Sequence, residues 1–168
     1  MPQTTINKVQ PQGIVGEPFS SYPMGVTTYV IAGTATADPV IGLACTLGTS
    51  GETPVVGGTG KFAGIIVNPK DQVAKTALTA TMDITIGTES GTKYARAPLA
   101  KEGMWWVKNG TAVTYGGEVQ YNTDTGALSQ PTSAGTADAK NVILKGAIWA
   151  SNQANANTLA LVQLGGAY

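Results

Sequence analysis

The chain has 168 residues, of which ten are lysine or arginine and ten are aspartate or glutamate, so its formal net charge is zero. Charged residues make up 12% of the chain, about half the usual share, and there is no histidine. This composition argues against a nucleic-acid-binding protein, which needs a basic face, and against histidine-based catalysis. A neutral polar surface lacks charge repulsion and favours a protein that lies against other proteins.

The length suits a single domain, which we expect to cover residues 21–168. Residues 1–20 are expected to form an extended arm, because prolines interrupt any helix and only Ile14 and Val15 offer an apolar anchor. Two interpretations of this arm stay open: a frayed chain end, or a strap laid over a neighbouring subunit.

Short β signals make up the rest of the chain. Runs rich in apolar and β-branched residues, bounded by glycine, proline or asparagine, predict strands. These runs are residues 26–31, 40–47, 61–67, 142–150 and 158–164, with a strictly alternating run at 82–86. A short helix from Asn68 through Leu78 is the main helical signal, with proline at its first position. Gly64 and Gly146 lie in similar runs, and a close approach of two backbones would explain each glycine.

Residues 103–128 contain two neighbouring tryptophans and a strong turn signal. Asn109-Gly110 is typical of a type I′ hairpin, which would pair the strand before it with residues 111–115. In that hairpin Trp105 and Trp106 point to opposite faces, so one ring enters the core and the other points outward or toward a partner. Which ring is buried stays open, because a one-residue slip exchanges them.

After the predicted hairpin the pattern continues as a meander. Val119 and Tyr121 alternate with Glu118 and Gln120, which predicts a strand. A turn at residues 124–126 follows this strand. Residues 131–138 are small and polar and predict an exposed loop.

Motifs for catalysis, cofactors and metals are missing, so we expect none of these sites. The glycine-rich stretch at 57–61 fails the phosphate-loop spacing, because residue 55 is valine and residue 62 is phenylalanine. Cys45 lies in an apolar run and is expected as a free thiol in the core, which fits synthesis in a cytoplasm. A sugar-binding groove between Glu102 and Glu118 stays open as a minor alternative. No apolar run approaches the roughly 20 residues that a membrane helix needs.

Three stretches resemble the capsid cement (decoration) proteins of tailed bacteriophages. Residues 9–18, VQPQGIVGEP, resemble the family's proline-rich start, residues 62–69 its central core strand, and residues 103–126 its late meander. The resemblance implies an all-β, jelly-roll-like sandwich or barrel that binds the outer face of an assembled head. It also implies the major capsid protein of an HK97-like shell as partner, self-association as dimers or trimers, no cofactor and no enzymatic activity.

The candidate partner contacts are apolar and aromatic residues of the arm and of the tryptophan region: Ile14, Val15, Phe19, Trp105 and Tyr115. We expect them to face the shell on the exterior of the virion, after synthesis in the bacterial cytoplasm. The alternative is a carbohydrate- or receptor-binding β module of a phage head or tail fibre. Such a module would stack its ligand on Trp105, Trp106 and Tyr115.

Overall fold

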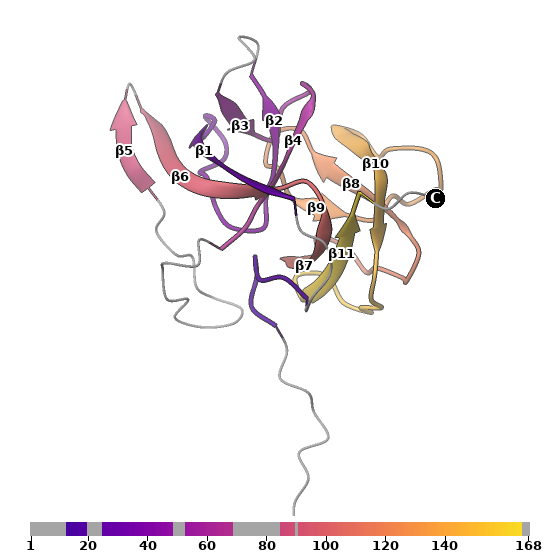
Figure 1. Ribbon diagram of the computed structural model, residues 1–168. Helices are drawn as coiled ribbons and strands as arrows, with labels where there is room; N and C mark the ends of the chain where they lie inside the picture. The colour runs from indigo at the N-terminus through magenta and orange to yellow at the C-terminus, as the bar shows by residue number, and fades with distance from the viewer. Residues whose placement is uncertain (1–12, 20–24, 49–52, 69–84, 90, 166–168) are drawn as a thin grey trace, which may run out of the picture.

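The computed structural model describes residues 13–19, 25–48, 53–68, 85–89 and 91–165, which Figure 1 shows as a ribbon. These residues form strands and no helix, so none of the described segments is a helix that could cross a membrane. The strands are β1 (Val26–Ala32), β2 (Ala44–Leu47), β3 (Pro54–Val56), β4 (Phe62–Ile66), β5 (Thr85–Glu89), β6 (Thr92–Ala100), β7 (Gly103–Lys108), β8 (Glu118–Asn122), β9 (Leu128–Ser129), β10 (Asn141–Trp149) and β11 (Leu159–Leu164). The predicted all-β fold is confirmed.

The first sheet closes into a barrel. Its strands run in the order β1-β3-β2-β4-β6, and β6 returns to pair with β1 over residues 94–100. β5 extends the sheet from β6 and lies outside the ring (Figure 1). Aliphatic side chains fill the barrel, among them Ile31, Ile66 and Leu99, which are fully buried. Side chains of this kind suit a pleated surface that is covered on its inner face.

The second sheet has the order β7-β11-β10-β8-β9. Its outer strands approach each other, because the Gly110 N–H donates to the Leu128 carbonyl (2.7 Å) and Asn109 forms a parallel bridge to Leu128. Trp149 and Tyr121 are fully buried inside the curled sheet. The second sheet therefore curls around these two buried rings.

The turn after β8 joins the two sheets. The Gly126 carbonyl accepts a hydrogen bond from the Ala44 N–H (2.8 Å), and the Thr123 carbonyl accepts one from the Gly58 N–H (2.7 Å). One hydrophobic cluster also contains side chains from both sheets, since Ala44 of the first packs with Tyr121 and others of the second. The sheets thus form one packed body, and the jelly-roll-like sandwich or barrel class is confirmed.

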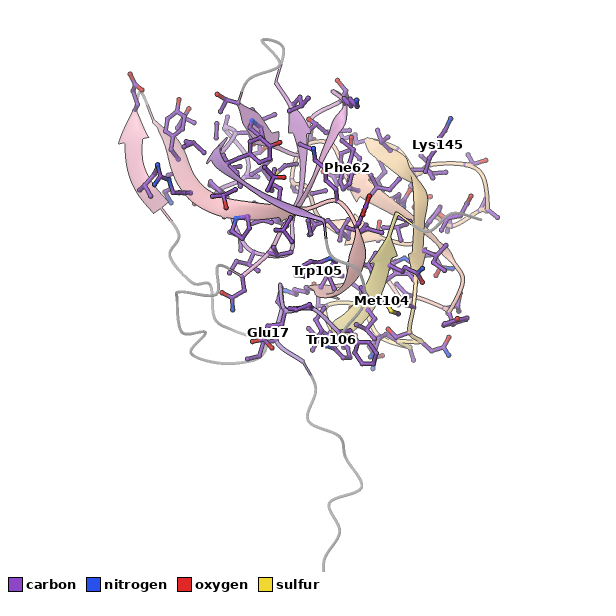
Figure 2. The ribbon with its side chains drawn as sticks, in the orientation of Figure 1. Glu17, Phe62, Met104, Trp105, Trp106 and Lys145 are labelled. Carbon is purple, nitrogen blue, oxygen red and sulfur yellow. The ribbon has the colours of Figure 1, made fainter. Side chains whose placement is uncertain are left out.

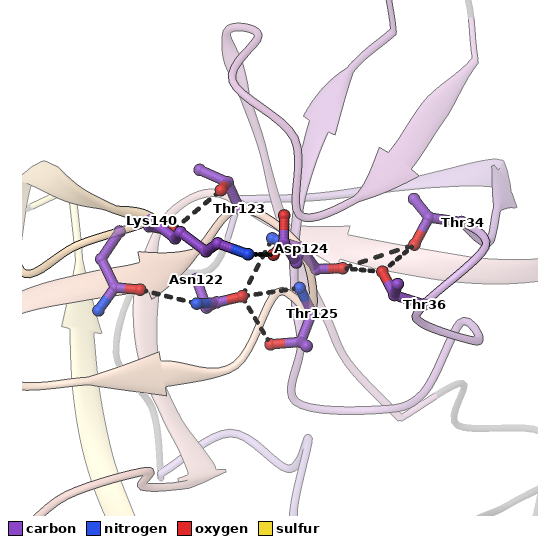
Figure 3. A network of polar contacts seen from close by, with 8 residues as sticks. Thr34, Thr36, Asn122, Thr123, Asp124, Thr125 and Lys140 are labelled. Carbon is purple, nitrogen blue, oxygen red and sulfur yellow. Dashed lines mark hydrogen bonds and ion pairs between the residues drawn. The ribbon is translucent and has the colours of Figure 1, made fainter.

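A polar network fixes the shape of this turn (Figure 3). Asn122 Oδ1 accepts hydrogen bonds from the backbone N–H groups of Asp124 and Thr125, both at 3.0 Å. The Asp124 carbonyl accepts a hydrogen bond from the hydroxyl of Thr36 (2.9 Å), which follows β1 of the first sheet. The Asp124 carboxylate forms an ion pair with Lys140 (2.8 Å). The predicted turn at 124–126 is confirmed, and it is tied to both sheets.

Most of the predicted strands are present. The runs 26–31, 61–67, 142–150 and 158–164 match β1, β4, β10 and β11 to within one residue at each end. In the run 40–47 only Ala44–Leu47 is a strand, because Gly42 adopts a φ of 91° in a preceding turn. The alternating run is a strand from Thr85 onward. Its residues 82–84, and the predicted helix after Asn68, lie outside the described residues.

The hairpin predicted at Asn109-Gly110 is wrong. β7 pairs with β11, from Gly103 opposite Leu164 to Lys108 opposite Leu159, and residues 111–115 form no strand. Neither turn residue has the positive φ that a type I′ turn requires. The buried Asn109 side chain instead donates to the Asn155 carbonyl (2.8 Å) and accepts from the Thr158 N–H (2.8 Å). Long-range pairing has overridden the local turn signal.

Gln120 of β8 is fully buried, and its amide donates to Asp138 Oδ2 (2.6 Å).

The expected close backbone approach is present at one of the two strand glycines and absent at the other. Gly64 does lie at a close approach, since a Cβ there would be 2.8 Å from the Ala100 carbonyl oxygen. Gly146 does not, because nothing lies within 4 Å of such a Cβ. Its φ of 80° explains this glycine instead.

Candidate partner-binding surface

Residues 13–19 of the arm lie along the outer edge of β7 (Figure 1). The Gly16 N–H donates to the Trp106 carbonyl (2.7 Å), and the Trp106 N–H donates to the Glu17 carbonyl (3.0 Å). The Phe19 N–H donates to the Met104 carbonyl (2.8 Å). An uncovered strand edge offers its free N–H and C=O groups to other chains. The arm closes this edge and adds one irregular strand to the second sheet.

Gly16 and Val15 anchor the arm between the two sheets. A Cβ on Gly16 would lie 2.2 Å from the Ile41 side chain, and its φ is 82°, so glycine is required on both grounds. The Asn68 N–H donates to the Gly16 carbonyl (3.0 Å), and Val15 packs against the core of the first barrel. Residues 13–19 are therefore docked on their own domain.

The docked arm leaves an aromatic pair at the surface. Phe19 and Trp106 meet edge to face, with ring centroids 6.0 Å apart and an interplanar angle of 75°. Phe19 is 43% exposed, and Trp106 is half-buried. Figure 2 shows Trp106 with Met104 and Glu17 at this end of the molecule. We call Phe19, Met104 and Trp106 the arm surface.

The two tryptophans lie on opposite faces of β7, as predicted, and Trp105 is the buried one. Its ring is 3% exposed, and its indole N–H donates to the Glu102 carbonyl (2.9 Å). This burial corrects the choice of Trp105 as a partner contact, because the ring has no face left for another molecule. Ile14 and Val15 are half-buried in the docked arm.

Tyr115 is 70% exposed but is not part of the arm surface. It precedes β8, and the N–H of its neighbour Gly116 donates to the Trp149 carbonyl at the end of β10 (2.8 Å). In the second sheet, β11 and β10 separate β7 from β8. The structure therefore does not assemble Trp105, Trp106 and Tyr115 into the platform that a sugar-binding module would use.

The described residues hold no group of three or more histidine, cysteine, aspartate or glutamate side chains that could bind a metal ion. Burial raises the pKa of the Cys45 thiol, so the thiol stays protonated and is a poor nucleophile. Glu118, one wall of the alternative sugar groove, accepts a hydrogen bond from the Gly135 N–H (2.5 Å). The geometry supports a contact surface more strongly than a reaction centre.

The family model of structural cement proteins (E217 gp24/Pam3 gp6) matches residues 2–165. The chain belongs to the phage structural cement protein family. No curated protein matches it. The fold of this cement protein is similar to that of a chain in the solved capsid of Myoviridae phage XM1, with a TM-score of 0.62 and 14% identity. That match covers 96% of this chain and 94% of the other.

The match confirms the family predicted from three short stretches of sequence, and with it the role of a capsid cement or decoration protein. The cement protein is a structural component of the virion that associates with the capsid shell. Sequence reasoning missed Met104 as a surface residue, and it named Trp106 only as one of two tryptophans that could face outward and as a stacking residue of the alternative module. Gly13 was a sequence signal that the arm packs closely against another residue, because a Cβ there would lie 2.1 Å from the Trp106 ring. Glycine in an extended segment often marks a close approach of this kind.

Proposed function

We propose that the arm surface is the side by which this cement protein binds the outer face of an assembled head. There it would stabilise contacts between the major capsid proteins of an HK97-like shell. The observation that carries the proposal is the fixed arm, in which residues 13–19 are bonded to β7 while Phe19 stays 43% exposed over Trp106. An aromatic pair that is ordered beforehand loses little conformational entropy when a partner covers it.

The mechanism is thermodynamic and needs no catalysis. A ligand that binds the assembled shell but not free subunits adds RT ln(1 + [L]/Kd) per site, or about 2.7 kcal/mol at a concentration 100 times Kd. Many such sites together oppose disassembly. Zero net charge lets copies pack closely, and we propose that they associate as dimers or trimers on the shell. The free, buried Cys45 supports synthesis in the reducing cytoplasm of the bacterial host.

Binding to heads assembled without the cement protein tests the proposal. Intact heads are closed to an added protein, so co-sedimentation reports binding to the exterior. Phe19→Ala should bind more weakly than the wild type, whereas Val142→Ala should match it. Val142 is 37% exposed on β10 and so has comparable exposure away from the arm. Equal binding by Phe19→Ala and the wild type would rule out the arm surface.

A single substitution is a better test than removal of the arm. Deleting residues 1–20 would uncover the β7 edge and remove the Val15 side chain from the core of the first barrel. Loss of binding by that variant would not separate a lost contact from a damaged fold. If the unaltered protein does not bind heads at all, the whole proposal fails.

A further inference from the structure

Three loops without a single charged residue gather at one end of the second sheet. They are residues 109–117, residues 150–158 and residues 130–137, and we call them the distal loops. Residues 130–137 are the first part of the segment between β9 and β10, which continues through Asp138 and Lys140 toward the other end of the sheet. The distal loops lie at the Glu118 end of β8, whereas its Asn122 end leads into the turn that contacts the first barrel. Surface loops normally carry charges, so this end of the molecule stands apart even in a chain of low charge.

Side-chain amides tie the distal loops to one another. Gln130 Oε1 accepts a hydrogen bond from the Thr114 N–H (2.8 Å), and Asn152 Oδ1 accepts one from the Tyr115 N–H (2.8 Å). Backbone bonds of 2.8 and 2.9 Å between Val113 and Gln153 join two of the loops directly. Because these bonds already fix the loops, binding a partner would cost little further ordering.

Tyr115 projects from this fixed base. It occupies the corner of a tight turn that the Gly117 N–H closes on the Thr114 carbonyl (3.0 Å), with Gly116 at a φ of 78°. The side chain is 70% exposed, the largest value among the exposed large hydrophobic residues that the structure describes. A rigidly held tyrosine among small and amide residues is the composition that protein-binding loops use for their anchors.

We propose that the distal loops form a second contact surface, which binds an uncharged protein surface on a neighbouring shell subunit. This inference rests on the proposed function and gives it the second contact that a bridge between subunits requires. A charged partner would lose hydration there and would meet only the carboxylates of Glu118 and Asp138, which already accept hydrogen bonds from Gly135 and Thr132, so the loops favour an uncharged partner. The amide oxygens of Gln130 and Asn152 are engaged by the protein's own backbone, and the chain belongs to a family of structural cement proteins, which favours a protein partner over a sugar.

The test measures affinity for heads assembled without the cement protein. Tyr115→Ala removes the anchor, and Ala112→Lys places a charge on the distal loops. Ala139→Lys is the matched control, because Ala139 is also exposed but precedes β10 at the opposite end of the sheet. Tyr115→Ala and Ala112→Lys should bind about tenfold more weakly or worse, and Ala139→Lys should match the wild type. Wild-type affinity should change little between about 0.05 and 0.5 M salt.

Each outcome decides between defined alternatives. Wild-type affinity in both Tyr115→Ala and Ala112→Lys, or a steep salt dependence, would overturn the inference. Loss of binding in Phe19→Ala alone would do the same and leave the proposed function standing. Binding to a neutral polysaccharide that Tyr115→Ala abolishes, with head binding unchanged, would assign the distal loops to glycans instead. Thermal unfolding by circular dichroism should show the same midpoint for Tyr115→Ala and the wild type, because the ring is exposed.

Discussion

Replacing Phe19 by alanine should weaken binding to heads roughly 30-fold, a magnitude that follows from the exposed ring area. The residue is 43% exposed, and a phenylalanine presents about 200 Å², so about 85 Å² is open to a partner. At about 25 cal/mol per Å², covering that area stabilises the complex by about 2 kcal/mol. Each 1.4 kcal/mol is about a tenfold change in Kd, which gives the factor above.

The assay is a titration of heads with labelled protein, followed by sedimentation and counting of bound protein. The edge-to-face contact with Trp106 disappears in the same variant, so the free energy of unfolding should fall by about 1 kcal/mol. The binding titrations should therefore be run well below the unfolding temperature of the Phe19→Ala variant. A variant that is destabilised by this amount yet binds within about threefold of the wild type would refute the reasoning, because the ring would then serve only to dock the arm.

Three further predictions concern the fold. Asn109→Ala should lower the free energy of unfolding by about 3 kcal/mol in urea titrations, because several buried partners lose their hydrogen bonds; a loss below about 1 kcal/mol would contradict this. Gly64→Ala should destabilise by more than Gly146→Ala, because only Gly64 combines a positive φ with a backbone oxygen 2.8 Å from the new Cβ; equal losses in thermal unfolding would show that close approach is unimportant. Hydrogen bonds from the side chains of Thr132 and Gln120 lower the pKa of Asp138, so its stabilisation is present above the ordinary aspartate pKa of about 3.9 and is lost as the pH falls through the lowered pKa. Asp138→Asn should remove this part of the acid dependence, and identical acid unfolding curves for the variant and the wild type would count against it.

Strands could be predicted where the run itself is apolar. β10 and β11 consist mainly of aliphatic residues, which favour a strand whatever strand lies beside them. The pairing of strands could not be predicted in the same way. Asn109-Gly110 is a strong local turn signal in the sequence. The Asn109 side chain, however, is hydrogen-bonded to Thr158, which lies 49 residues further along the chain. The six-residue pairing of β7 with β11 outweighs a single turn.

The candidate surface could be predicted only in part. Prolines and an isolated apolar pair indicated the arm, but nothing local indicated that it returns to β7. The pleat required Trp105 and Trp106 to face opposite ways, and the pairing of Val162 with Trp105 decides which ring is inside. Tyr115 is exposed because the turn at Gly116 replaces the expected strand. Each of these outcomes depends on distant residues that a local pattern does not contain.

The two contacts can act together only if their separation is fixed. Both lie on the second sheet, because the arm is hydrogen-bonded to Trp106 of β7 and the distal loops follow β7, β9 and β10. The hydrogen-bonded strands of this sheet therefore hold the arm surface and the distal loops at a fixed separation. The turn after β8 also packs closely against the first sheet, since a Cβ on Gly57 would lie 2.4 Å from the Thr123 carbonyl oxygen. A rigid protein with two contact surfaces gains binding free energy from both of them only where the shell subunits lie at the matching spacing. We therefore expect the assembled geometry of the shell, more than the chemistry of either contact, to decide where this cement protein binds.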